Sequence, residues 1–167
     1  MKKGARKQII KRGNKKKFNL KVFVFSFVAV LIVAFLGSLF TDTGSWYDTI
    51  KPSITPPNIV FPIAWTTLFI LIALSMYFSW INAKDNQKDR VTLFYAINLI
   101  LNILWTVIFF GMKQTGVALF EIAVLWISVL SLMIINWKIS KTATWLLLPY
   151  LLWISFATLL NILIVFA

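Results

Sequence analysis

The chain has 167 residues, 60% of them apolar, and a mean hydropathy of +0.85. Soluble domains rarely exceed half apolar residues, so this composition excludes an ordinary soluble domain. The net charge is +12, and the chain has no cysteine and no histidine. Their absence excludes disulfides, thiol nucleophiles, imidazole relays, zinc sites and a haem held by an axial His or Cys. We therefore predict no metal site and no resident cofactor.

The chain begins with a basic tail, residues 1–20, followed by an apolar stretch, residues 22–40. Ten of the 17 Lys and Arg residues lie at positions 2–21, which favours a cytoplasmic tail that fixes topology and contacts anionic lipid head groups. Nucleic-acid binding is the alternative, but the tail has one aromatic residue, Phe18, and no recognition motif. The apolar stretch exceeds the roughly 7–15 residues of a cleaved signal and lacks a small-residue cleavage site, so we expect it to be retained as a helix.

Five apolar stretches are each near the roughly 20 residues that cross about 30 Å of hydrocarbon. They predict an all-α integral membrane bundle of five transmembrane helices within residues 21–167. The predicted helices are 22–40, 60–81, 91–111, 117–136 and 144–167. In this topology 15 Lys and Arg residues lie on one side and two on the other. We therefore expect a protein of a prokaryotic cell membrane with a cytoplasmic N-terminus and an outer C-terminus.

The connection between the first two helices, residues 41–59, is long, stiff and aromatic. Three prolines restrict its backbone, and Trp46 and Tyr47 precede Asp48. Because proline fixes φ and restrains the residue before it, this loop loses little entropy on ordering. The prolines are Pro52, Pro56 and Pro57. We interpret the loop as a lid over a ligand pocket, and the second helix begins just after it with Trp65 in its first turns.

The third helix carries Asn98 and Asn102 four residues apart, so both lie on one face, with Trp105 near that face. A buried amide either forms a helix–helix hydrogen bond or contributes a polar contact to a ligand. We favour the helix–helix bond for Asn98 and leave both possibilities open for Asn102. The fourth helix holds Glu121, the only acid inside a predicted span, for which both a structural and a proton-relay role are open. Lys113 is close enough in sequence to pair with it.

The fifth helix contains Pro149, which can kink it, followed by Tyr150, Trp153 and Ala157 at three- and four-residue spacing. Together with Trp65, Trp105 and the aromatic residues of the loop, Trp153 can line one cavity. Flat aromatic walls suit a flat, largely apolar ligand. Uniform aromatic enrichment of a small membrane bundle is the competing explanation.

Four motifs occur in an order and spacing that resemble one known family. They are WYDTIKPSITPP in the first loop, FPIAWTTLF in the second helix, LNILWTVIFFG in the third and PYLLWISFATLLN in the fifth. The chain resembles the translocator protein / tryptophan-rich sensory protein (TspO/MBR) family, formerly called the peripheral benzodiazepine receptor family. The resemblance implies a five-helix, often dimeric bundle whose pocket is closed by the first loop.

The resemblance also implies binding of porphyrins, such as protoporphyrin IX or haem, and of isoquinoline- and benzodiazepine-type molecules. It carries pocket roles to matching residues: Trp46, Trp65, Asn102, Trp105, Trp153 and Ala157. We expect a porphyrin-binding sensor or carrier. The alternatives are a light-dependent porphyrin-degrading enzyme that uses Trp65 and Trp153, and a proton-coupled transporter.

The sequence departs from the family pattern at three points. Ile54 and Phe69 replace residues that are usually an aromatic and a Tyr, and no basic residue follows Tyr150. The last departure removes the cholesterol-type motif, so the resemblance does not extend to sterol binding.

Overall fold

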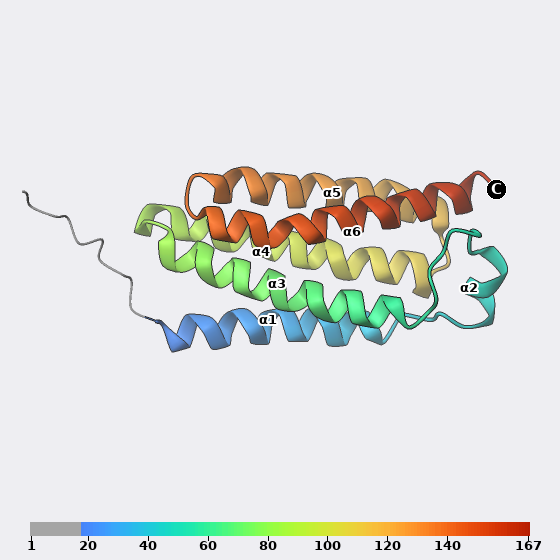
Figure 1. Ribbon diagram of the computed structural model, residues 1–167, viewed down its shortest axis with the longest axis horizontal. Coiled ribbons are helices and arrows are strands. Elements are labelled where there is room, and N and C mark those ends of the chain that lie inside the picture. Colours follow the sequence, from blue (N-terminus) through green and yellow to red (C-terminus); the bar gives the residue numbers. More distant parts are fainter. Residues whose placement is uncertain (1–17) are drawn as a thin grey trace, which may run out of the picture.

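The computed structural model describes residues 18–167, which form an elongated bundle of helices (Figure 1). Nearly all of the predicted basic tail, residues 1–20, lies outside the described residues. Within them, five helices are long and apolar enough to cross a membrane. They are α1 (Leu20–Ser38), α3 (Val60–Asn82), α4 (Asp85–Thr106) continued by the π-helical turn η1 (Val107–Gly111), α5 (Thr115–Trp137) and α6 (Lys141–Val165). The predicted all-α membrane fold is confirmed.

Two helices begin three or more residues earlier than the apolar pattern indicates. α4 starts at Asp85 rather than at residue 91, because Asp85 favours the positive N-terminal end of the helix and forms an ion pair of 2.8 Å with Lys88. α6 starts at Lys141 rather than at residue 144, since the Ser140 hydroxyl accepts a hydrogen bond of 3.3 Å from the Ala143 amide. Hydropathy marks where a chain enters lipid, whereas these helices begin in the polar layer outside it.

The five long helices close into a ring. The main packing contacts run from α1 to α3, from α3 to α6, from α6 to α5, from α5 to α4, and from α4 back to α1. A short helix, α2 (Ser45–Ile50), lies in the first loop and projects beyond one end of the bundle, on the side of the C-terminus (Figure 1). We call this the loop end and the opposite end, where α3 meets α4 and α5 meets α6, the closed end.

The interior of the closed end is tied together by a buried polar network. The Tyr95 hydroxyl lies 2.6 Å from the Ser75 hydroxyl and accepts a hydrogen bond of 2.8 Å from the Asn136 amide. Ser79 donates to the Asn136 side-chain oxygen, and Ser75 donates to the backbone carbonyl of Ala143 at 2.7 Å. All four polar side chains are fully buried. Because every bond joins different helices, the network holds α3, α4, α5 and α6 in register.

Candidate ligand cavity

The loop end of the ring encloses a cavity of about 480 Å³. This volume falls in the range of pockets that hold cofactor- or drug-sized molecules. Its walls come from α1, α3, α4, η1, α6 and the first loop. The lining residues are Ala34, Gly37, Ser38, Thr41, Thr43, Tyr47, Asn58, Phe61, Pro62, Trp65, Thr66, Phe69, Asn102, Trp105, Thr106, Phe109, Phe110, Trp153, Ala157, Leu160, Asn161 and Ile164. The lining is mainly apolar and aromatic.

One wall is an aromatic cluster built by the change from α4 to η1. Trp105 stacks on Phe109 with ring centroids 5.0 Å apart and an interplanar angle of 22°, and Phe110 meets Trp105 edge to face at 6.0 Å. In the π-helical turn the Met112 amide donates to the Val107 carbonyl at 2.8 Å, five residues back. This wider turn brings two consecutive phenylalanines into the interior, and such turns are frequent at functional sites.

The facing wall combines α3 and α6. Phe61, Trp65 and Phe69 recur at four-residue spacing, so α3 presents all three to the cavity. Phe61 meets Trp153 of α6 edge to face at 6.0 Å, and Trp65 meets Tyr150 at 6.4 Å. Two indoles therefore lie on neighbouring helices of one wall, where a flat ring can contact both.

Polar side chains occur at both ends of the cavity, and Asn102 lies at its inner end. The Asn102 amide donates to the Tyr150 hydroxyl at 3.0 Å, and Asn102 also lines the cavity. Asn102 thus makes a helix–helix bond and lies at the cavity, and its contact with a ligand stays a prediction. Asn98 instead donates to Ser128 of α5 at 2.8 Å and does not line the cavity, as expected for a helix–helix bond.

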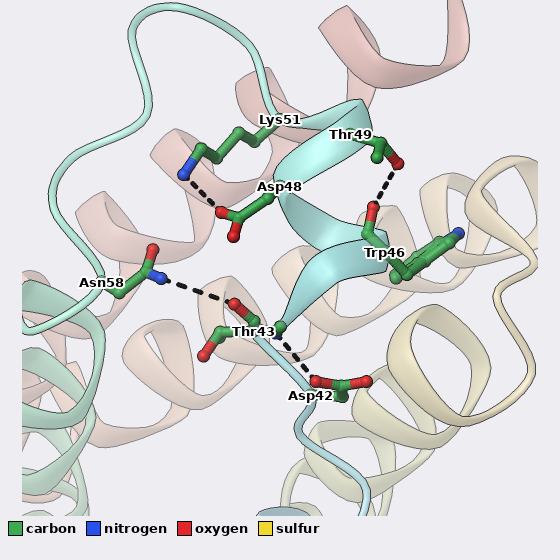
Figure 2. A network of polar contacts seen from close by, with 8 residues as sticks. Asp42, Thr43, Trp46, Asp48, Thr49, Lys51 and Asn58 are labelled. Atoms are coloured by element: carbon green, nitrogen blue, oxygen red, sulfur yellow. Dashed lines mark hydrogen bonds and ion pairs between the residues drawn. The ribbon is translucent and has the colours of Figure 1, made fainter.

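The first loop covers the cavity and is held by short-range polar contacts (Figure 2). The Asn58 amide donates to the Thr43 carbonyl at 3.4 Å, which joins the two ends of the loop, and Asp48 pairs with Lys51. Tyr47 is the buried residue of α2, and its ring centroid lies 5.7–6.3 Å from those of three phenylalanines: Phe61, Phe109 and Phe110. Burial raises the pKa of the Tyr47 hydroxyl, so this group is a neutral hydrogen-bond donor at physiological pH.

Six of the ten predicted ligand-binding residues line the cavity: Tyr47, Trp65, Asn102, Trp105, Trp153 and Ala157. The other four do not: Trp46, Pro52, Pro56 and Pro57. Successive residues of α2 point about 100° apart, so the helix buries Tyr47 and turns Trp46 outward. The Trp46 ring packs against Phe109 at 5.9 Å, with the Lys113 ammonium 5.4 Å from its centroid. It lies across α2 from the Lys51–Asp48 ion pair (Figure 2).

Four phenylalanines of the lining were not predicted: Phe61, Phe69, Phe109 and Phe110. Helical spacing from Trp65 and Trp105 gives the first three, since each lies four residues from a predicted indole. The position of Phe110 in the lining can be explained only by the π-helical turn, because Phe110 is five residues from Trp105.

Glu121 is buried in α5 with 5% of its surface exposed, and neither carboxyl oxygen has a hydrogen-bond partner. The predicted pairing with Lys113 is wrong, because the Lys113 ammonium lies over the Trp46 ring instead. Among the described residues no group of three acidic, His or Cys side chains is placed to hold a metal ion.

Comparisons with known proteins identify the family of this chain. Residues 25–166 match the model of the TspO/MBR family. Tryptophan-rich protein TspO of Archaeoglobus fulgidus is 41% identical over 146 residues, which cover 86% of this chain and 94% of that protein. Tryptophan-rich protein TspO of Chlorobaculum tepidum is 41% identical over 138 residues (78% and 85%). Translocator protein of Homo sapiens is 34% identical over 132 residues (76% and 78%). The chain is therefore an integral membrane protein that belongs to the TspO/MBR family.

Proposed function

We propose that this protein binds a tetrapyrrole, protoporphyrin IX or haem, inside the loop-end cavity and acts as a membrane sensor or carrier of that ligand. One observation carries the proposal: three tryptophans from three helices, Trp65, Trp105 and Trp153, line a single cavity of about 480 Å³. Indole faces favour planar π-systems by stacking and by burial of apolar area.

The polar groups of the cavity suit the edge of such a ligand rather than its metal. Asn102 and Tyr47 offer hydrogen-bond donors to carbonyl or carboxylate groups. The chain has no histidine or cysteine to ligate iron strongly. The proposal therefore rests on shape, stacking and edge contacts, and predicts comparable affinity for metal-free and iron-containing rings.

The direct test is quenching of tryptophan fluorescence of the purified protein by added protoporphyrin IX. We expect saturable quenching, and a loss of affinity of about tenfold in Trp153→Ala, which removes a stacking face worth about 0.5–1.5 kcal/mol together with its apolar contact area. Trp145→Ala is the matched control, because Trp145 is exposed at the closed end. Linear quenching that is equal in all three proteins means partition into detergent and contradicts the proposal.

A second candidate function is light-dependent breakdown of the bound porphyrin. It is favoured by the position of the redox-active indoles of Trp65 and Trp153 on the same wall. Illumination of the complex should then produce a new absorbing species that is lost in Trp65→Phe. Formation of the same species by free porphyrin in detergent would exclude a role for the protein.

Proton-coupled transport has less support. Glu121, the acid it requires, is not among the residues that line the cavity, and no imidazole is available to extend a relay. Uptake that is unchanged in Glu121→Gln would exclude this function.

We also infer a cytoplasmic closed end and an outward-facing cavity in a prokaryotic cell membrane. The inference rests on the excess of Lys and Arg at the N-terminus and closed-end connections. The chain has no cysteine, so Lys51→Cys and Lys138→Cys provide single reporters at the two ends. A membrane-impermeant maleimide should label the first in intact cells and the second only after lysis. Binding of anionic lipid by the basic tail and homodimer formation stay predictions.

A further inference from the structure

Behind the aromatic wall, two neighbouring helices each bury a polar side chain that has no hydrogen-bond partner. The Trp105 indole of α4 is 9% exposed, and the Glu121 carboxyl of α5 is 5% exposed. The indole nitrogen and both carboxyl oxygens are buried and unpaired. Buried polar atoms are nearly always paired in proteins, so a donor and an acceptor left together in one region indicate a function.

The packing register of α4 and α5 places these two side chains opposite each other. The hydrogen bond from Asn98 to Ser128 fixes how the two antiparallel helices align. On α4, Trp105 lies seven residues, or about two turns, beyond Asn98 toward the loop end. On α5, Glu121 lies the same distance from Ser128, also toward the loop end. Two full turns return each helix to nearly the same face. Trp105 and Glu121 therefore share one level of the same helix–helix interface.

Within residues 18–167, no cationic side chain pairs with Glu121. The charged residues of α4 lie in its first turns at the closed end, Lys141 of α6 lies at that end too, and η1 has no charged residue. Lys113, in the turn before α5, contacts Trp46. On α6, the Tyr150 hydroxyl lies within electrostatic reach of Glu121 and accepts its own hydrogen bond from Asn102.

We propose that Glu121 is a positioning residue for Trp105. When Glu121 is ionised, its carboxylate accepts a hydrogen bond from the Trp105 indole. When it is protonated, the indole N–H is released and donates to an acceptor group of a ligand in the cavity that Trp105 lines. Only this last step rests on the proposed ligand function. Glu121 thus couples its protonation state to recognition of planar ligands that carry carboxylate or carbonyl groups.

The side-chain chemistry allows this exchange without movement of the helices. Glutamate has three rotatable side-chain bonds, so its carboxylate can turn toward the indole, and a hydrogen bond to a charged acceptor is stronger than one to a neutral acceptor. The Trp105 nitrogen is buried, so its release requires a turn about the side-chain bonds that carries the indole N–H toward the cavity, along the face that stacks on Phe109.

The first experiment follows the indole N–H in ligand-free protein labelled with ¹⁵N-tryptophan. Trp105→Phe assigns the Trp105 signal among the eight tryptophans. Between about pH 5 and about pH 9 this proton should shift downfield in one transition, which Glu121→Gln should abolish and Glu121→Asp should restore. The signals of Trp137 and Trp145 at the closed end report that each variant is folded. Absence of a transition in the wild type, or its persistence in folded Glu121→Gln, overturns the proposal.

Asp89→Asn is the matched control. It removes an exposed acid near the start of α4, far from Trp105, and should leave the transition unchanged. Because no ligand is present, this experiment stands whether or not the protein binds a porphyrin.

The second experiment measures ligand affinity across the same transition. Binding of protoporphyrin IX, which carries carboxylates, should weaken about tenfold as pH rises, the loss expected for one charge-assisted hydrogen bond. Octaethylporphyrin, which carries no oxygen acceptor, should show no such change. Trp105→Phe should remove the pH dependence. If it persists in Trp105→Phe, Glu121 acts on the ligand by direct repulsion and the positioning role is wrong.

Discussion

The two ends of the bundle use the same helices for opposite purposes. At the closed end, Ser75, Ser79, Tyr95 and Asn136 are fully buried and joined by hydrogen bonds across four helices. At the loop end, a cavity separates the helices, and the indole of Trp105 and the carboxyl of Glu121 are buried without partners. A satisfied buried network rigidifies and specifies the fold, whereas unpaired buried groups indicate a role other than holding the fold.

The comparison teaches that stability and recognition are separated along the bundle axis. The closed end fixes helix register, so the loop end can form a cavity without losing the fold. Substitutions at the closed end should therefore change stability, and substitutions at the loop end should change affinity.

The largest expected effect comes from enlarging an alanine at each end of α6. Ala143 is fully buried at the closed end, and its carbonyl accepts from Ser75, whereas Ala157 lines the cavity. Ala143→Leu should lower the free energy of unfolding by about 1–3 kcal/mol, because overpacking displaces this backbone. Ala157→Leu should leave stability within about 0.5 kcal/mol of wild type and weaken porphyrin binding by tenfold or more. Unfolding in mixed micelles and fluorescence quenching measure the two quantities.

If both leucine variants lose stability equally, the loop end is as tightly packed as the closed end and the cavity is not a binding site. Loss of affinity in Ala143→Leu alone would place the ligand elsewhere.

A smaller effect distinguishes the two buried tyrosine hydroxyls. Tyr95→Phe leaves the Asn136 amide without its acceptor and should cost about 1–2 kcal/mol of stability with no change in affinity. Tyr150→Phe frees the Asn102 amide beside the cavity and should cost about 0.6 kcal/mol. Protoporphyrin affinity should rise about threefold, since the amide can then donate to the ligand. Equal affinities in both variants would show that Asn102 only joins helices.

The five helices could be predicted from sequence because lipid demands long apolar spans, but the starts of α4 and α6 could not. Asp85 and the Ser140 cap stabilise the starts of α4 and α6 outside the apolar stretches, where hydropathy gives no signal. The closed-end network was not predicted either, since Ser75, Ser79 and Tyr95 are scattered through apolar spans and only the folded bundle brings them together.

The cavity was predicted in part for equally physical reasons. Trp65, Trp105 and Trp153 lie on regular helices, where spacing defines a face. Trp46 lies outside the lining because its segment forms a six-residue helix, α2, which turns Trp46 away from Tyr47, and no sequence pattern indicated this helix. Phe110 was missed because it depends on a π-helical turn, whose register differs from that of an α-helix.

The smallest expected effect concerns how the first loop is fastened over the cavity. The Lys113 ammonium lies 5.4 Å from the Trp46 ring centroid and links α2 to the turn before α5. An exposed contact of this kind contributes about 0.5–1 kcal/mol. Lys113→Met should therefore speed porphyrin dissociation about threefold with little effect on unfolding, as measured by stopped-flow fluorescence. Lys51→Met is the matched control, because the Lys51–Asp48 pair lies within the loop and does not join it to the bundle. Equal dissociation rates in wild type and Lys113→Met would show that the buried Tyr47 cluster alone holds the loop closed.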